Sequence, residues 1–239
     1  MRSRPMNDAT RCPVVLITAD LEATATVPGG RTEREYRLRA NYAEAVAEAG
    51  GLPLILPFHD EHLEAVLALA DGVLVTGTAP GADVAPDRLA FEQQLVAGAL
   101  AVGLPLLGIC HGMQLIGECL GGHVVRDDPK LLAGVTPHIP AAVPDVLAHG
   151  VELLGGSRLA AGYPARRARV NSLHRHALAD GGRYRVAARA ADGVVEAIEG
   201  LDEGFCLGVQ WHPEYRLTDL DRHVLQRFVA QCAARAVPR

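Results

Sequence analysis

Short apolar runs alternate with amphipathic stretches along the first half of the chain. The apolar runs at 13–18, 52–57, 72–77 and 104–107 have the length of buried strands. Apolar side chains recur at helical spacing in 36–49, 61–70 and 89–102, and a further helix-like stretch follows residue 112. Residues 19–32 are predicted to be a loop. This alternation predicts a parallel sheet with helices on both faces, so chemistry is expected at the carboxyl ends of its strands.

The pattern changes after residue 121, where the predicted elements become shorter. The stretches 169–174, 184–188 and 194–198 are predicted to be short strands separated by Asp-Gly turns, which is typical of antiparallel hairpins. The apolar run at 205–210 predicts one more strand of the sheet, and residues 218–234 predict a closing helix. We expect residues 1–12 to be a disordered tail and residues 13–236 to form a single domain.

The composition indicates a folded globular protein. Of its 239 residues, 49% are hydrophobic and 21% are charged. The net charge of -5 argues against nucleic acid as a partner, because phosphate binding requires clustered cationic side chains. No run approaches the roughly 20 apolar residues of a membrane span, so no membrane partner is expected. The sequence leaves a homodimer open.

The five cysteines are odd in number and widely spaced along the chain. None belongs to a CxxC pair, so no zinc site is predicted. Free thiols are stable in a reducing compartment, and we therefore expect a cytoplasmic protein.

One cysteine stands between an apolar run and a helix-like stretch. In Gly108-Ile109-Cys110-His111-Gly112 a glycine lies two residues to each side of it. This is the spacing of a nucleophile elbow, in which small neighbours let a strained turn hold a reactive side chain above a sheet. The start of a helix also favours thiolate over thiol. The alternative is an inert cysteine buried at a strand end.

A histidine and a carboxylate follow the last apolar run, in Gly208-Val209-Gln210-Trp211-His212-Pro213-Glu214. Pro213 fixes the backbone between His212 and Glu214, so these side chains can lie close together. A cysteine nucleophile needs a base, and the base needs a group that orients it. Taken singly, His212 could be one of ten histidines without a role and Glu214 a surface carboxylate. Together with Cys110 they are candidates for a catalytic triad.

These two motifs resemble the class I glutamine amidotransferase family. The stretch Val170-Asn171-Ser172-Leu173-His174-Arg175-His176 is similar to the Val-Asn-Ser-x-His-His-Gln segment of its γ-glutamyl-γ-aminobutyrate hydrolase branch. Residues 49–53 and 83–86 also resemble that branch, and the resemblance covers about residues 13–232. A polar strand end without a role is the alternative for residues 170–176.

The resemblance implies a flavodoxin-like, three-layer α/β/α fold with a central, mostly parallel sheet and a small antiparallel addition. It implies hydrolysis of a γ-glutamyl amide in a small-molecule substrate, through a thioester on Cys110. His212 would act as base and acid, and Glu214 would orient it. Thiolate chemistry requires no metal and no organic cofactor. Backbone N–H groups of Gly77 and His111 would hold the oxyanion, and the substrate would be bound by Gln114, Asn171, Ser172 and His174.

Three departures from the branch fall near the substrate. The turn after the third predicted strand is Gly77-Thr78-Ala79-Pro80-Gly81 where Gly-Gly is usual. The loop before Arg88-Leu89-Ala90-Phe91-Glu92 is short and this sequence lacks the usual aspartate, and His176 stands in place of a glutamine. The leaving amine therefore stays open. Besides a stand-alone hydrolase, the chain could be a glutaminase subunit that supplies ammonia to a partner synthase, or a non-catalytic binding protein on the same fold.

Overall fold

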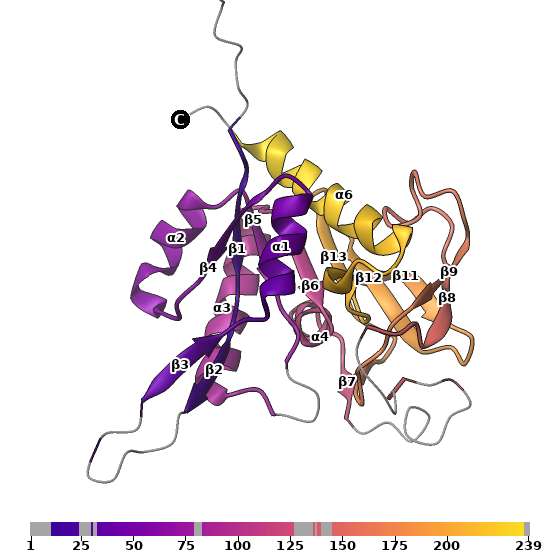
Figure 1. Cartoon of the computed structure of the whole chain (residues 1–239), viewed down its shortest axis with the longest axis horizontal. Coiled ribbons are helices and arrows are strands. Elements are labelled where there is room, and N and C mark those ends of the chain that lie inside the picture. Colours follow the sequence, from indigo (N-terminus) through magenta and orange to yellow (C-terminus); the bar gives the residue numbers. More distant parts are fainter. Residues whose placement is uncertain are drawn as a thin grey trace, which may run out of the picture.

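The core of the protein is one nine-stranded sheet with the strand order β4-β1-β5-β6-β13-β12-β11-β8-β9 (Figure 1). The computed structural model describes residues 11–23, 30, 33–78, 83–126, 136, 138–139 and 145–236. Five adjacent strands are parallel, and their bounds are β4 (Leu52–Ile55), β1 (Val14–Ile17), β5 (Gly72–Val75), β6 (Leu106–Ile109) and β13 (Cys206–Val209). Each of these five strands overlaps one of the apolar runs that the sequence predicted to be strands.

Four antiparallel strands continue the same sheet beyond β13. They are β12 (Val195–Gly200), β11 (Tyr184–Ala190), β8 (His149–Leu153) and β9 (Arg167–Val170). The hairpin predicted around Asp192-Gly193 is the β11–β12 pair. The antiparallel part is thus nearly as wide as the parallel part. A separate two-stranded ladder pairs β7 (Val124–Val125) with β10 (Ala177–Leu178).

Helices cover both faces of the parallel strands. On one face α1 (Ala40–Glu48) and α6 (Asp219–Arg235) pack on Val15 and Ile17 of β1 and on their neighbours. On the other face α2 (Leu63–Leu69), α3 (Pro86–Ala101) and α4 (His111–Cys119) pack in the cluster that contains Leu16. Alternate residues of a strand point to opposite faces, so each apolar strand serves both layers. This confirms the predicted α/β fold with a helical layer on each side.

Two element boundaries differ from the sequence prediction. Residues predicted as loop and first helix instead form the hairpin of β2 (Asp20–Ala23) and β3 (Arg34–Arg37), which extends from the sheet at the lower left of Figure 1. Arg37 pairs with Glu22 across it at 2.5 Å, and the Tyr36 ring meets Phe58 edge-on at 5.1 Å. These contacts with other segments override the helical spacing, so α1 starts only at Ala40. The predicted tail at 1–10 and residues 24–29 and 31–32 of the predicted loop lie outside the described residues.

Helix α3 begins earlier than predicted, because Pro86 occupies its first turn, where a missing N–H does no harm. The short helix η1 (Asp60–His62) precedes α2, and η2 (Pro213–Tyr215) precedes α6. None of the helices in the described residues is long and apolar enough to cross a membrane.

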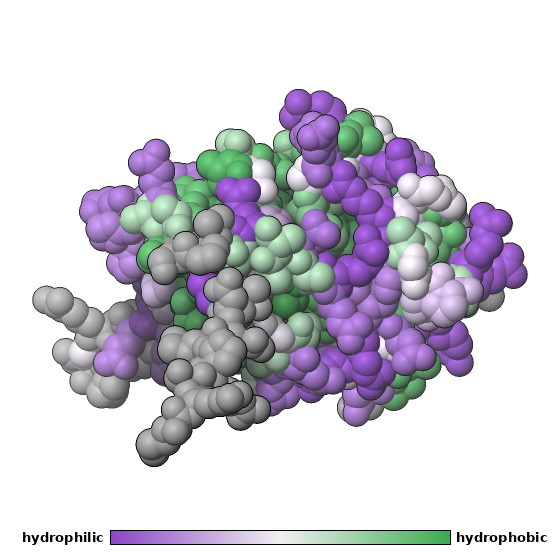
Figure 2. Space-filling model, turned by 90° about the horizontal axis from the view of Figure 1, so that it is seen from above, coloured by the Kyte–Doolittle hydropathy of each residue, from purple (hydrophilic) through white to green (hydrophobic). Residues whose placement is uncertain are grey.

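The surface mixes hydrophilic and hydrophobic side chains, as Figure 2 shows for the face seen from above. The edge strand β4 contributes exposed apolar side chains, namely Leu52, Leu54 and Ile55. Buried and exposed positions do not alternate along β4, because this strand lies at the margin of the sheet and is only partly covered.

Candidate active site

Cys110 occupies a strained turn between β6 and α4. Its φ of 53° and ψ of -104° lie in a region that non-glycine residues rarely adopt. A Cβ at Gly112 would come within 2.1 Å of the Val75 carbonyl oxygen, and one at Gly108 within 2.5 Å of the Gly112 backbone. Both positions therefore require glycine for β5, β6 and α4 to approach one another. The predicted elbow geometry is present.

The elbow places Cys110 at the N-terminus of α4, which begins with His111. The first N–H groups of a helix have no acceptor within it, and their partial positive charge favours an anion nearby. The backbone N–H of Cys110 donates to the Val209 carbonyl at 2.8 Å. This bond joins the ends of β6 and β13, so the residues that follow β13 lie beside the thiol.

His212 and Glu214 form the buried pair that the second motif predicts. Nδ1 of His212 lies 2.7 Å from Oε1 of Glu214, and neither side chain is more than 3% exposed. Burial opposes a charge on His212, but the Glu214 carboxylate and the Cys110 side chain outweigh it and raise the pKa of His212 to about 10. Nε2 of His212 has no hydrogen-bond partner among the described residues. The nitrogen not held by Glu214 is therefore available for proton transfer.

Gly77, Cys110 and His212 meet at the carboxyl ends of β5, β6 and β13. A Cβ at position 77 would lie 2.9 Å from Cε1 of His212 and 3.5 Å from Cβ of Cys110. A side chain at this position would therefore collide with the imidazole. The topology thus brings together three predicted site residues that are 33 to 135 positions apart in the sequence.

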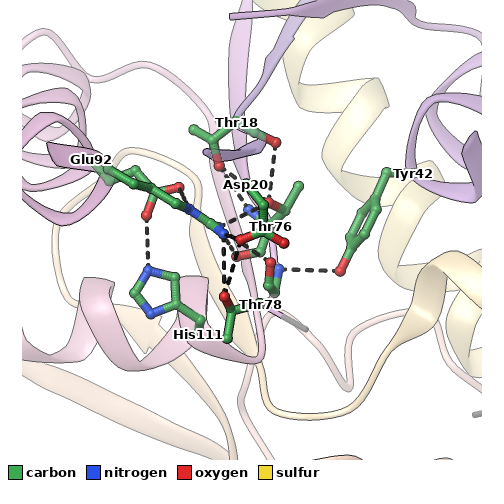
Figure 3. Close-up of polar contacts among 9 residues, drawn as sticks. Thr18, Asp20, Tyr42, Thr76, Thr78, Glu92 and His111 are labelled. Carbon is green, nitrogen blue, oxygen red and sulfur yellow. Dashed lines mark hydrogen bonds and ion pairs between the residues drawn. The ribbon is translucent and has the colours of Figure 1, made fainter. Parts of the chain in front are cut away.

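The oxyanion role predicted for Gly77 is not supported by its backbone. Its N–H donates to the Tyr42 hydroxyl at 3.1 Å, in a buried position on α1 (Figure 3). Burial, followed by the charge of Glu214, raises the pKa of Tyr42 well above its ordinary value, so the hydroxyl stays protonated. The sequence reasoning missed Tyr42 because its helical spacing identified it only as a core residue. His111 is the first residue of α4, where backbone N–H groups have no acceptor within the helix, so its N–H stays a candidate for the oxyanion donor.

A chain of buried charges fixes the elbow to the end of β5. Nε2 of His111 lies 2.8 Å from Oε2 of Glu92, and Arg88 donates to the other Glu92 oxygen at 2.9 Å (Figure 3). Arg88 also donates to the Thr76 and Gly77 carbonyls at 3.1 and 3.2 Å, and it pairs with Asp20 of the β2–β3 hairpin. Burial opposes ionisation of Glu92, but the hydrogen bond from His111 and the charge of Arg88 lower its pKa. Arg88 and Glu92 belong to the segment in which the sequence departs from the γ-glutamyl-γ-aminobutyrate hydrolase branch.

Gln114 contacts the site through a second amide. Its Nε2 donates to Oε1 of Gln210 and to the His176 carbonyl, each at 3.1 Å. Nε2 of Gln210 in turn lies 3.5 Å from Sγ of Cys110. Gln114 thus orients Gln210, a residue the sequence reasoning did not assign although it belongs to the second motif.

The three other residues predicted to bind substrate have protein partners instead. Asn171 holds the His212 backbone in both directions: its Oδ1 accepts from the His212 N–H at 2.9 Å and its Nδ2 donates to the His212 carbonyl at 3.2 Å. Ser172 donates to the His138 carbonyl at 2.6 Å, and His174 faces His138 and Glu196. Each of the three is nearly inaccessible to solvent. The prediction of direct substrate contact is therefore not supported at these positions, because all three side chains are used to support neighbouring segments.

A cleft opens to solvent beside the imidazole. It is lined by Asp20 and Arg37 of the hairpin, by Thr78 of the turn after β5, and by Arg39 and His212. The guanidinium groups and the carboxylate give it charges of both signs, suited to a small polar substrate.

Comparison with known proteins gives a family and a fold for the chain. Residues 13–214 match the peptidase C26 family. The γ-glutamyl-γ-aminobutyrate hydrolase PuuD of Escherichia coli K12 is 32% identical over 218 residues, which cover 82% of this chain and 86% of that protein. A glutamine amidotransferase from Thermotoga maritima superposes with a TM-score of 0.64 at 18% identity, covering 92% of this chain and 99% of the other. A glutamine amidotransferase from Methylobacillus flagellatus gives 0.57 at 15% identity, with 93% of each chain covered. These two structures confirm the fold.

Proposed function

The chain belongs to the peptidase C26 family of glutamine amidotransferase-like hydrolases, and we propose that it cleaves a γ-glutamyl amide bond with Cys110 as nucleophile. One observation carries the proposal. A strained elbow cysteine lies beside a histidine whose Nδ1 is held by Glu214 at 2.7 Å and whose Nε2 is unpartnered among the described residues. This arrangement fits the nucleophile, base and orienting acid of cysteine-dependent acyl transfer.

In the first half of the reaction, Sγ of Cys110 attacks the γ-carbonyl carbon of the substrate. The thiol proton passes to Nε2 of His212, and the new imidazolium is stabilised by the Glu214 carboxylate. The oxyanion accepts the N–H of His111 at the start of α4. When the tetrahedral intermediate collapses, the C–N bond breaks and the amine leaves with the proton from His212. A γ-glutamyl thioester remains on Cys110.

In the second half, water replaces the amine in the same place. His212 takes a proton from the water as its oxygen attacks the thioester carbonyl, and the same N–H stabilises the oxyanion. Collapse breaks the C–S bond and releases glutamate. The proton on His212 returns to the sulfur, and the enzyme is restored. The high pKa of His212 supports the first step, because it stabilises the imidazolium that forms when the thiol proton is transferred.

The charges of the cleft support a substrate that carries carboxylates. Arg37 and Arg39 line the cleft together with His212. A γ-glutamyl derivative of an amino acid has a carboxylate at each end, and guanidinium groups are the side chains that best match carboxylates. PuuD is named for such a compound, γ-glutamyl-γ-aminobutyrate. We therefore place an acidic leaving amine on the side of the hairpin.

A hydrolysis screen tests this function. The full chain is incubated with γ-glutamyl-γ-aminobutyrate, other γ-glutamyl amines and glutamine, and released glutamate is measured. We expect turnover of γ-glutamyl-γ-aminobutyrate without any partner, and none with the Cys110→Ala variant. A chain that is silent with every substrate until a synthase is added would instead be an amidotransferase subunit. Alkylation of Cys110 no faster than of Cys119 or Cys232 would identify a non-catalytic binding protein.

A further inference from the structure

Three imidazoles and a carboxylate converge at one buried point outside the triad. They belong to His138, His149 at the start of β8, His174 after β9, and Glu196 on β12, and one ligand atom from each lies within 4.8 Å of all the others. None of these residues is more than 5% exposed. Residue spacing does not predict this cluster, because its members are spread over 59 positions without any metal-binding spacing.

Each imidazole is oriented by a partner on its outer side. Nε2 of His138 lies 2.9 Å from the Asp192 carboxylate, and Nδ1 of His174 lies 3.0 Å from the His176 carbonyl. Nδ1 of His149 lies 3.4 Å from the Gly150 carbonyl. These acceptors hold the proton on the outer nitrogen, so the inner nitrogen of each neutral ring presents a lone pair to the common centre.

Four of the six distances between the inner atoms fit tetrahedral spacing. Oε1 of Glu196 is 3.3, 3.4 and 3.5 Å from the inner nitrogens of His138, His149 and His174, and the inner nitrogens of His138 and His174 are 3.2 Å apart. Bonds of about 2.0–2.1 Å from zinc to nitrogen or oxygen place tetrahedral ligands roughly 3.3–3.4 Å from one another. Four edges of the cluster therefore match a four-coordinate metal.

A proton alone would leave most of these atoms unsatisfied. One proton between His138 and His174 serves two nitrogens, whereas Nε2 of His149 and both Glu196 oxygens have no hydrogen-bond partner among the described residues. Buried polar atoms without partners are costly, and lone pairs that face one another repel. A divalent cation at the centre would satisfy all four atoms.

We propose that His138, His149, His174 and Glu196 form a closed structural site for a divalent transition-metal ion, with zinc as the best match. Imidazole nitrogens with one carboxylate oxygen suit zinc and its neighbours in the first transition row, and not calcium or magnesium. Four protein ligands complete a tetrahedron and leave no position for water, so the site would be structural.

The metal would fasten four segments beside the active site. His174 and Gln114 share the His176 carbonyl, and Gln114 reaches Cys110 through Gln210. Ser172 holds the His138 carbonyl from the same stretch that clamps His212. Loss of the ion is therefore expected to loosen residues 170–176 and to lower thermal stability. This site does not depend on the proposed hydrolysis.

Metal binding is tested on the full chain carrying Cys110→Ala, so that the elbow thiol does not contribute. After chelator treatment and dialysis against Zn²⁺, mass spectrometry of the metal content is expected to give one equivalent per chain. Co²⁺ in its place is expected to give the intense visible bands of tetrahedral cobalt and a higher melting temperature than the metal-free chain. Less than half an equivalent of Zn²⁺, or only the weak bands of octahedral cobalt, would overturn the proposal.

Variants locate the site. Asp192→Asn keeps all four ligands but weakens the partner of His138, so the Zn²⁺ affinity should fall about 10–100-fold, whereas Asp180→Asn on a nearby turn should leave it unchanged. His149→Cys retains a ligand and should add a thiolate-to-cobalt charge-transfer band in the near ultraviolet. An Asp192→Asn chain with unchanged affinity, or a His149→Cys chain that binds Co²⁺ without that band, would place the metal elsewhere. Because none of these readouts is catalytic, their failure would leave the proposed hydrolase untouched.

Discussion

Oε2 of Glu92 lies 2.8 Å from Nε2 of His111, so a fully buried carboxylate on α3 holds the residue that follows Cys110, the proposed nucleophile. The other oxygen of Glu92 accepts from Arg88, which is also fully buried and anchors the turn after β5. Two loops of the site are therefore fixed by one buried ion pair. Removing one partner of a buried pair leaves the other charge uncompensated.

Replacement of Glu92 by glutamine should accordingly destabilise the fold and the elbow together. We expect Glu92→Gln to lower the free energy of unfolding by on the order of 3 kcal/mol, because Arg88 loses its fully buried carboxylate partner. Urea unfolding measures this, with the exposed Glu61→Gln as control. A loss below about 1 kcal/mol, typical of surface pairs, would show that the pair does not anchor the site.

The strained backbone of Cys110 predicts an inverted order of stability between two small substitutions. Alanine is ordinarily more stable than glycine, by about 0.5–1 kcal/mol inside regular structure. At φ of 53° and ψ of -104° the Cβ itself is unfavourable, so Cys110→Gly should be at least as stable as Cys110→Ala. Both variants should be inactive. Thermal unfolding of the two proteins decides the point, and a clearly more stable alanine variant would argue against strain at the elbow.

The raised pKa of His212 predicts how stability depends on pH. Its value of about 10 in the folded protein exceeds the roughly 6.5 expected for the unfolded chain. The folded state therefore binds the additional proton in this window, so the stabilisation is complete below about pH 6.5 and is lost as the pH rises through about 10. Glu214→Gln removes the carboxylate that favours the imidazolium and should flatten this decline. Urea unfolding between pH 6 and 10.5 tests it, with Glu203→Gln as an exposed control. Equal slopes in the wild type and Glu214→Gln would contradict the assignment.

The features that sequence could predict are those that depend on local order. Gly108 and Gly112 flank Cys110 because β5, β6 and α4 meet there without room for a Cβ. This glycine spacing can be recognised directly in the sequence. Pro213 sets His212 and Glu214 side by side over two residues. The strand–helix alternation predicted a sheet covered on both faces, which the packing of Val15 and Leu16 on opposite sides confirms.

The features that sequence could not predict depend on partners far along the chain. The helical spacing predicts Tyr42 only as a core residue, yet its hydroxyl accepts a hydrogen bond from the N–H of Gly77. His174 belongs to a family-like segment that was predicted to bind substrate, yet it faces Glu196 from another strand. In each case the side chain's role is fixed by strand order and helix placement, which residue spacing alone does not contain.

A substitution at Asn171 distinguishes a residue that positions His212 from one that contacts the substrate. Its amide pairs with both the N–H and the carbonyl of His212, at 2.9 and 3.2 Å. Asn171→Leu has a similar volume but leaves these two backbone groups unpaired, so His212 should shift relative to Cys110. A displacement of about 1 Å can cost roughly 100-fold in rate, and we expect kcat on γ-glutamyl-γ-aminobutyrate to fall by about that factor with KM little changed. Asn171→Asp keeps the acceptor for the His212 N–H but turns a carboxylate oxygen toward the His212 carbonyl, so it should not restore kcat. A variant that raises KM while kcat stays near the wild-type value would instead make Asn171 a substrate ligand, as the sequence alone predicted.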